Sequence, residues 1–117
     1  GFMAWKRGWK VLYEPRSIVY HEHRGTIGKK FSQEYISGVI KKNILLFCWK
    51  NIHEWRRLWS NFTYTYLGAI LSSLFGHSPE RSSFRGIFRA FLQLPGAMLS
   101  RAEALRLAKV SDTEAFA

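Results

Sequence analysis

One apolar segment limits what this chain of 117 residues can fold into. Residues 8–23 read GWKVLYEPRSIVYHEH. Residues 9–13 are rich in aromatic and β-branched side chains, Pro15 breaks the run, and residues 17–20 resume it, which is typical of two short strands. The second strand would present His21 at its carboxyl end. Ligands of open α/β sheets bind at that edge, so the segment predicts a ligand site as well as a sheet.

The overall composition narrows the class of protein. A hydrophobic share of 47%, with 16% aromatic residues, excludes a disordered tail. The net charge of +10 favours a polyanionic partner, which could be nucleic acid, phospholipid headgroups or the phosphates of a nucleotide-linked substrate. Because Cys48 is the single cysteine, the chain can form neither a disulfide framework nor a cysteine-rich zinc module.

Helix signals cover most of the remaining sequence. Residues 2–7 resemble the last turns of a helix that Gly8 ends. Further helices are expected after Ser32, over residues 55–75, from Ser78-Pro79 and, beyond a break at Pro95-Gly96, over residues 98–110. The sequence therefore predicts an α+β chain, mostly α, in which two short strands precede three or four helices.

The helix expected after Ser78 is amphipathic and basic. It carries an apolar stripe on one face and three arginines, spaced four apart, on another. The stripe consists of Phe84, Ile87, Phe88, Phe91 and Leu92, and the arginines are Arg81, Arg85 and Arg89.

Both ends of the sequence indicate a piece of a larger protein. Gly1 falls within an expected helix, and residues 111–114 fit a capping box that predicts another helix, although only three residues follow it. We therefore expect further chain on each side.

The first segment also resembles a known family. Residues 5–15 (WKRGWKVLYEP) and 17–21 (SIVYH) resemble the end of the catalytic domain of family-2 glycosyltransferases. The resemblance implies a GT-A fold, with residues 1–31 as the C-terminal remnant of that domain and residues 32–117 as a helical extension. It also implies inverting transfer of a sugar from a nucleotide-diphosphate donor to an acceptor hydroxyl on a glycan or a lipid-linked molecule. The family's Asp-x-Asp motif and carboxylate base would precede Gly1.

The same resemblance suggests which residues act. It implies a divalent metal, Mn2+ or Mg2+, with His21 as a ligand, and a nitrogen ligand favours manganese. Alternatively, His21 bonds only the loop backbone. A basic loop containing His23, Arg24, Thr26 and Lys29 would bind the donor diphosphate, or it is simply solvated. Trp5 would stack on the acceptor or pack in the core. His53 and His77, at expected helix boundaries, are expected to cap a helix or lie on the surface.

The aromatic and basic residues allow other partners. Residues 62–75 are too short to cross a bilayer. Tryptophans beside Lys and Arg in residues 47–59 favour an interfacial helix on an anionic membrane, and hence a cytoplasmic protein peripheral to the inner face of the cell membrane. The alternative is a helical module without catalysis that binds a membrane surface or nucleic acid. Against nucleic acid, the charge is spread along the chain, with no finger spacing and no RNP-type strand.

Overall fold

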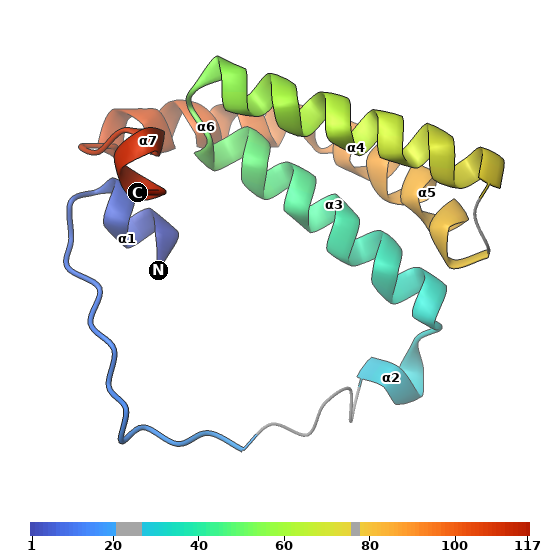
Figure 1. Ribbon diagram of the computed structural model, residues 1–117, viewed down its shortest axis with the longest axis horizontal. Helices are drawn as coiled ribbons and strands as arrows, with labels where there is room; N and C mark the ends of the chain where they lie inside the picture. The colour runs from blue at the N-terminus through green and yellow to red at the C-terminus, as the bar shows by residue number, and fades with distance from the viewer. Residues whose placement is uncertain (21–26, 76–77) are drawn as a thin grey trace.

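The structure, a computed structural model, describes residues 1–20, 27–75 and 78–117. In these ranges the chain forms helices and no strands. The helices, shown in Figure 1, are α1 (Phe2–Lys6), α2 (Ile27–Lys30), α3 (Gln33–Asn51), α4 (Trp55–Phe75), α5 (Ser78–Leu92), α6 (Leu94–Leu107) and α7 (Asp112–Ala115).

The two predicted strands, and with them the α+β fold class, are wrong for the described residues. Residues 9–20, which we call the arm, have no regular structure apart from a turn at Pro15 and Arg16. Figure 1 shows the arm leaving α1 as a wide arc away from the other helices. A strand needs a neighbour to receive its backbone hydrogen bonds, and among the described residues no strand pairs with the arm. Its large side chains are therefore solvent-exposed, up to 94% for Tyr20.

Most predicted helix boundaries are confirmed. The Ser32 hydroxyl accepts a hydrogen bond from the Tyr35 N–H at 3.2 Å and caps α3. Gly8 has a φ of 74°, in the left-handed region that glycine adopts without strain, and it follows Arg7, which caps the C-terminus of α1. The capping box of Ser111 and Glu114 is present and begins the single turn of α7. Sequence signals thus locate α1, α3, α4 and α7.

Two other boundaries differ from the prediction. The break between α5 and α6 falls at Gln93, and Pro95 lies in the first turn of α6 rather than in the break. Proline is tolerated there because the first-turn N–H groups have no partner within the helix. Helix α6 ends at Leu107 instead of residue 110. Within the predicted basic loop of residues 22–31, residues 27–30 form the one-turn helix α2.

The core lies where α3, α4 and α5 meet. Helix α3 packs against α5 and α6, and α4 packs against α5. The buried core cluster consists of Leu45, Trp49, Ile87 and Ala90, with Leu46, Leu58, Tyr66 and Leu94 packed around it. At the closest approach of α3 and α5, a Cβ atom on Gly86 would lie 2.6 Å from the carbonyl oxygen of Gly38. The backbones of these two helices therefore touch.

The helices are too short or too polar to cross a membrane in the part of the chain that the structure describes. Among residues 1–20, 27–75 and 78–117, no helix is both long enough and apolar enough to traverse a bilayer. The prediction that residues 62–75 do not span a membrane is confirmed to that extent.

Candidate functional site

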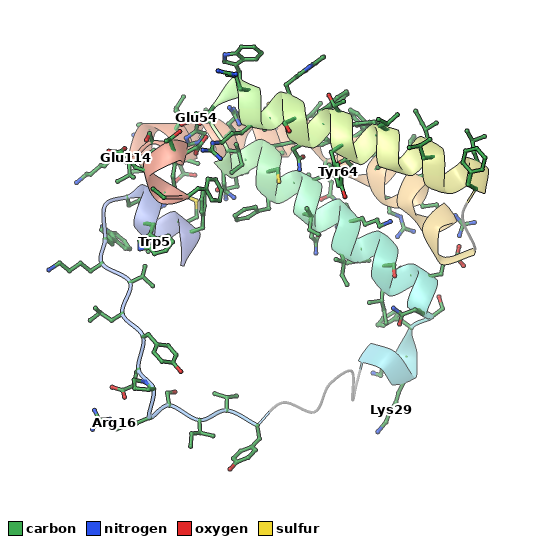
Figure 2. All side chains as sticks on the ribbon, viewed as in Figure 1. Trp5, Arg16, Lys29, Glu54, Tyr64 and Glu114 are labelled. Carbon is green, nitrogen blue, oxygen red and sulfur yellow. The ribbon has the colours of Figure 1, made fainter. Side chains whose placement is uncertain are left out.

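The structure describes only part of the site that the resemblance implies. His21, His23, Arg24 and Thr26 lie outside the described residues. Lys29 is exposed on α2, and Trp5 is 52% exposed on α1. Figure 2 shows Trp5 and Lys29 at opposite ends of the arc, so these two predicted site residues are not brought together.

A metal centre built entirely from described residues is not found. No group of three or more His, Cys, Asp or Glu side chains in the part of the chain that the structure describes is arranged to hold a metal ion. The predicted ligand His21 lies outside this part, so its role stays a prediction.

Helix α1, from which the arm leaves, is fixed to the C-terminal part of the chain. The carbonyl oxygen of Lys6 accepts hydrogen bonds from the N–H groups of Lys109 at 2.7 Å and Val110 at 3.2 Å. The ring of Phe2 packs 5.3 Å from Phe116, between centroids. Helix α1 is therefore held by residues more than 100 positions later in the sequence, although it has only five residues of its own.

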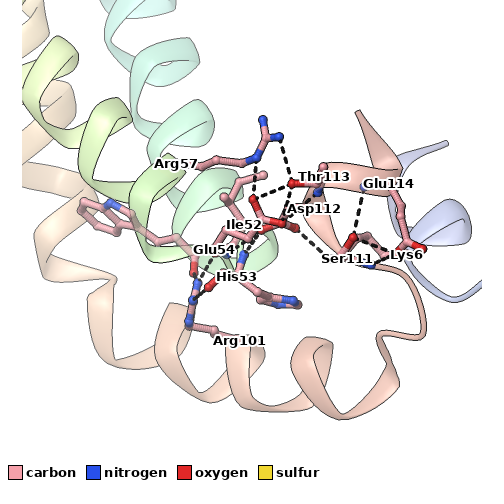
Figure 3. Close-up of polar contacts among 11 residues, drawn as sticks. Lys6, Ile52, His53, Glu54, Arg57, Arg101, Ser111, Asp112, Thr113 and Glu114 are labelled. Atoms are coloured by element: carbon pink, nitrogen blue, oxygen red, sulfur yellow. Dashed lines mark hydrogen bonds and ion pairs between the residues drawn. The ribbon is translucent and has the colours of Figure 1, made fainter. Parts of the chain in front are cut away.

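A buried ion pair at this junction joins α1 to α7. The ammonium Nζ of Lys6 lies 2.7 Å from Oδ1 of Asp112, and the two residues are 2% and 1% exposed. The other carboxylate oxygen, Oδ2, accepts the backbone N–H groups of His53 and Glu54, each at 2.6 Å. Asp112 therefore bonds both α1 and the turn that enters α4, as Figure 3 shows.

Glu54 makes the reciprocal contact. Its Oε1 accepts the N–H of Thr113 at 2.9 Å and the Thr113 hydroxyl at 3.0 Å. Asp112 thus satisfies N–H groups at the start of α4, while Glu54 satisfies one in the first turn of α7. The cross-linked set of Lys6, Glu54, Asp112 and Thr113 is called the clasp below.

Arg101 of α6 closes the other side of the same turn. Its Nη1 donates to the carbonyl oxygens of Trp49 at 2.6 Å and Ile52 at 2.5 Å. These carbonyls belong to the end of α3, where the last carbonyl groups have no acceptor role within the helix. A cation at a helix C-terminus also interacts favourably with the helix dipole. Arg101 therefore stabilises the turn between α3 and α4 through its carbonyl groups, whereas Asp112 binds the N–H groups of the same turn.

The electrostatics of the clasp follow from its contacts. Burial alone would raise the pKa of Asp112, but the Lys6 ammonium and the N–H groups of Glu54 and His53 together outweigh it. The pKa of Asp112 is therefore lowered from its ordinary value, and the carboxylate stays ionised. Because both of its oxygens already accept hydrogen bonds, Asp112 is suited to hold the fold rather than to act as a base or metal ligand.

His53 differs from the expectation of a cap or surface residue. Its Nε2 atom is buried and has no hydrogen-bond partner among the described residues. Burial, followed by the charges of Lys6 and Arg101, lowers the pKa of His53, and the Asp112 charge opposes this only in part. The ring lines a cavity of about 370 Å³ together with Lys6, Leu105, Val110 and Asp112. The lowered pKa favours a neutral imidazole for His53, beside the buried ion pair of Lys6 and Asp112.

Sequence reasoning missed the clasp. The capping box at Ser111 and Glu114 located the start of α7, but nothing in the spacing paired Asp112 with Lys6, which lies 106 positions away. The usable signal was Asp112 itself, an acidic residue directly after the capping residue Ser111, but none of its side-chain contacts is local.

Comparisons with known proteins add no family to this description. The chain matches no protein-family model, no curated protein and no solved structure.

Proposed function

We propose that the chain is part of an inverting, metal-dependent family-2 glycosyltransferase that moves a sugar from a nucleotide-diphosphate donor to an acceptor hydroxyl. Synthesis of a cell-surface polysaccharide or another glycan is the process that we propose for it. The observation that carries the proposal is the sequence of residues 5–21, WKRGWKVLYEPRSIVYH, with its resemblance to the end of that family's catalytic domain.

The exposure of the arm supports the proposal. The arm contains most of the resembling segment, and its apolar side chains are uncovered, including Leu12 at 87%. Exposed apolar side chains that are contiguous in the chain commonly mark a contact with another protein surface. On this proposal, the nucleotide-binding part of the transferase covers them.

The anchoring of the arm supports it as well. Lys6, which belongs to the resembling segment, is held by its ion pair with Asp112, and Gly8, two residues later, sets the direction in which the arm leaves. A catalytic group works only when its scaffold limits its position. The helical part would therefore serve as the platform from which the arm and the basic residues after it reach the donor.

Each proposed site residue has a chemical role in the transfer. His21 would ligate the metal ion, and His23, Arg24, Thr26 and Lys29 would contact the donor diphosphate. Trp5 offers a half-exposed aromatic face on which an acceptor could stack. A divalent cation, when bound, neutralises the negative charge that develops on the departing diphosphate. The family's carboxylate base and Asp-x-Asp motif match no residue of the chain, and we propose that another part of the protein supplies them.

The proposed location follows from the proposed acceptor. A lipid-linked or cell-surface glycan is made at a membrane, and nucleotide sugars are cytoplasmic donors. We therefore propose a cytoplasmic enzyme that is peripheral to the inner face of the cell membrane.

Binding of a nucleoside diphosphate tests the proposal directly. The full-length protein is titrated with UDP, GDP and dTDP in a calorimeter, with Mn2+, with Mg2+ and with EDTA. We expect one diphosphate to bind, and to bind more tightly with Mn2+ than with EDTA. Absence of binding for every diphosphate and metal would overturn the proposal. Salt-sensitive retention of an oligonucleotide in its place would identify the nucleic-acid-binding alternative.

A further inference from the structure

The outer face of α5 carries larger apolar side chains than its buried face does. Phe84, Phe88 and Leu92 are spaced four apart, so they lie on one side of the helix. They are exposed, Phe88 at 64% and Leu92 at 67%. Instead, α5 turns Ile87 and Ala90, with Gly86, towards the core. Of the apolar stripe that the sequence located, the structure buries Ile87 and leaves Phe84, Phe88 and Leu92 exposed.

The reason is the close approach of α3 and α5. Gly86 touches the backbone of Gly38, so only small or narrow side chains fit between the two helices. The phenylalanines of α5 have no room there and point elsewhere. Phe91 is the partial exception, since its ring lies 5.3 Å from Trp49 and 6.0 Å from Tyr66, between centroids.

Helix α4 extends the apolar surface. It packs beside α5, and Figure 1 shows the two helices side by side. Leu67, Leu71 and Leu74 of α4 are exposed, and residues 58–75 contain no charged side chain. Two neighbouring helices thus present large apolar side chains to solvent, which is more than the isolated exposed residues of an ordinary surface.

Basic side chains accompany this surface. Arg85 and Arg89 directly follow Phe84 and Phe88, and both are exposed. Neither forms an ion pair with a residue in the described ranges, and Arg89 only lies over the ring of Tyr35, 5.7 Å from its centroid. Arg56 is exposed at the start of α4, between the exposed Trp55 and Trp59. Exposed positive charge therefore lies beside uncovered apolar and tryptophan side chains.

We infer that this face of α4 and α5 docks on the surface of an anionic phospholipid bilayer. Phe84, Phe88, Leu92 and the exposed leucines of α4 enter the boundary between headgroups and acyl chains. Arg85 and Arg89 contact lipid phosphates, and Trp55 and Trp59 lie at the headgroup level, where amphipathic rings are favoured.

The charge of the face decides between a bilayer and other occupants. A second copy of the chain would bring two copies of this positively charged face together in a protein with a net charge of +10, which opposes association. A nucleic acid would satisfy the arginines but leave the phenylalanines and leucines in water. An anionic bilayer satisfies both kinds of side chain at once.

Vesicle flotation tests the inference on the full-length protein, without nucleotide or metal. One set of vesicles is phosphatidylcholine alone. In the other set, about one lipid in three is phosphatidylglycerol, which is enough for a negative surface potential. We expect binding to the anionic vesicles and much weaker binding to phosphatidylcholine. Phe88→Ser with Leu92→Ser, and separately Arg85→Gln with Arg89→Gln, should each lower the partition coefficient by roughly tenfold or more.

The matched controls are Leu105→Ser and Arg106→Gln, which alter exposed residues of α6 and should leave partitioning unchanged. Circular dichroism checks that each variant is folded. Equal binding of all variants, or no vesicle binding at all, would overturn the inference. If light scattering showed a dimer that the Phe88→Ser, Leu92→Ser variant loses while its vesicle binding stays intact, the inference would be overturned in favour of a second copy.

The inference deepens the peripheral location given under the proposed function, and it rests on that part of the proposal. The two fail separately, because sugar transfer to a detergent-dispersed acceptor needs no vesicle, and flotation needs no donor. A protein that transfers sugar but ignores anionic vesicles would contradict only the docking surface. A protein that floats with anionic vesicles but binds no nucleoside diphosphate would contradict only the transferase.

Discussion

Lys6 and Asp112 form a buried ion pair with 2.7 Å between Nζ and Oδ1, although 106 positions separate them in the sequence. The pair joins the first helix to the last. It also places the start of the arm, since Lys6 is two residues from Gly8, where the chain leaves the helical body. In the proposed enzyme, a contact of the C-terminal residues thus positions the segment that leads to His21.

Asp112→Asn should destabilise the protein strongly. The substitution leaves the Lys6 ammonium buried without a counter-charge, a change that typically costs about 3–5 kcal/mol. Urea unfolding measures the loss in free energy of unfolding. Glu103→Gln, an exposed change on α6, serves as the control and should stay within about 0.5 kcal/mol of the parent. The double variant Lys6→Met, Asp112→Asn should lose less than the two single losses added together, because the charges act as a pair. If the losses in free energy of unfolding were additive, that result would contradict the ion pair between Lys6 and Asp112.

Stability should fall as the pH drops through the range where histidine titrates. The pKa of His53 is lowered in the folded protein by burial and by the charges of Lys6 and Arg101. Below about 6.5, the ordinary value, the unfolded chain therefore binds a proton that the folded chain does not yet bind. The free energy of unfolding should decrease with falling pH until the folded-state pKa of His53 is passed. Chemical denaturation at a series of pH values measures this.

His53→Leu is the matched variant for that experiment. It removes the titrating group while keeping an apolar side chain in the partly buried position, so the slope in this pH window should shrink. A slope of opposite sign in the parent, or an unchanged slope in the variant, would refute the assignment to His53.

Gly86→Ala should lower the free energy of unfolding because of one backbone contact. A Cβ atom at this position would lie 2.6 Å from the carbonyl oxygen of Gly38, so α3 and α5 would have to separate. Overpacking of this kind costs about 1–3 kcal/mol. Gly68→Ala in α4 and Gly96→Ala in α6 are the controls, since nothing lies within 4 Å of their Cβ positions. Alanine should be neutral or stabilising there by helix propensity. Equal effects at all three glycines in thermal unfolding would exclude the close contact.

Helix boundaries could be predicted from the sequence because their signals are local. Ser32 bonds an N–H three residues away, Ser111 and Glu114 bond each other, and Gly8 supplies its own backbone conformation. Each interaction lies within one turn, so a short pattern contains all of its participants.

Other features depend on contacts that no local pattern contains. The apolar residues of the arm suggested strands, but a strand exists only with a neighbour, and the described residues supply none. The sequence located an apolar stripe on α5 but not the side of α5 that meets α3, because the close approach of Gly86 and Gly38 decides that. The clasp joins residues of α1, of the turn before α4 and of α7, which lie far apart in the sequence. In the candidate site, sequence reasoning chose residues around the arm and missed what holds the arm in place.

The central claim, that residues around His21 serve a metal-dependent sugar transfer, is tested most directly by one variant of the full-length protein. The initial rate of sugar transfer is measured against Mn2+ concentration for the parent, for His21→Ala and for the control His77→Ala, which has no part in the proposal. We predict that His21→Ala lowers the rate by about a hundredfold or more and shifts its manganese dependence to higher concentration, as expected for loss of a metal ligand, while His77→Ala matches the parent. An unchanged rate and an unchanged manganese dependence in His21→Ala would contradict the claim.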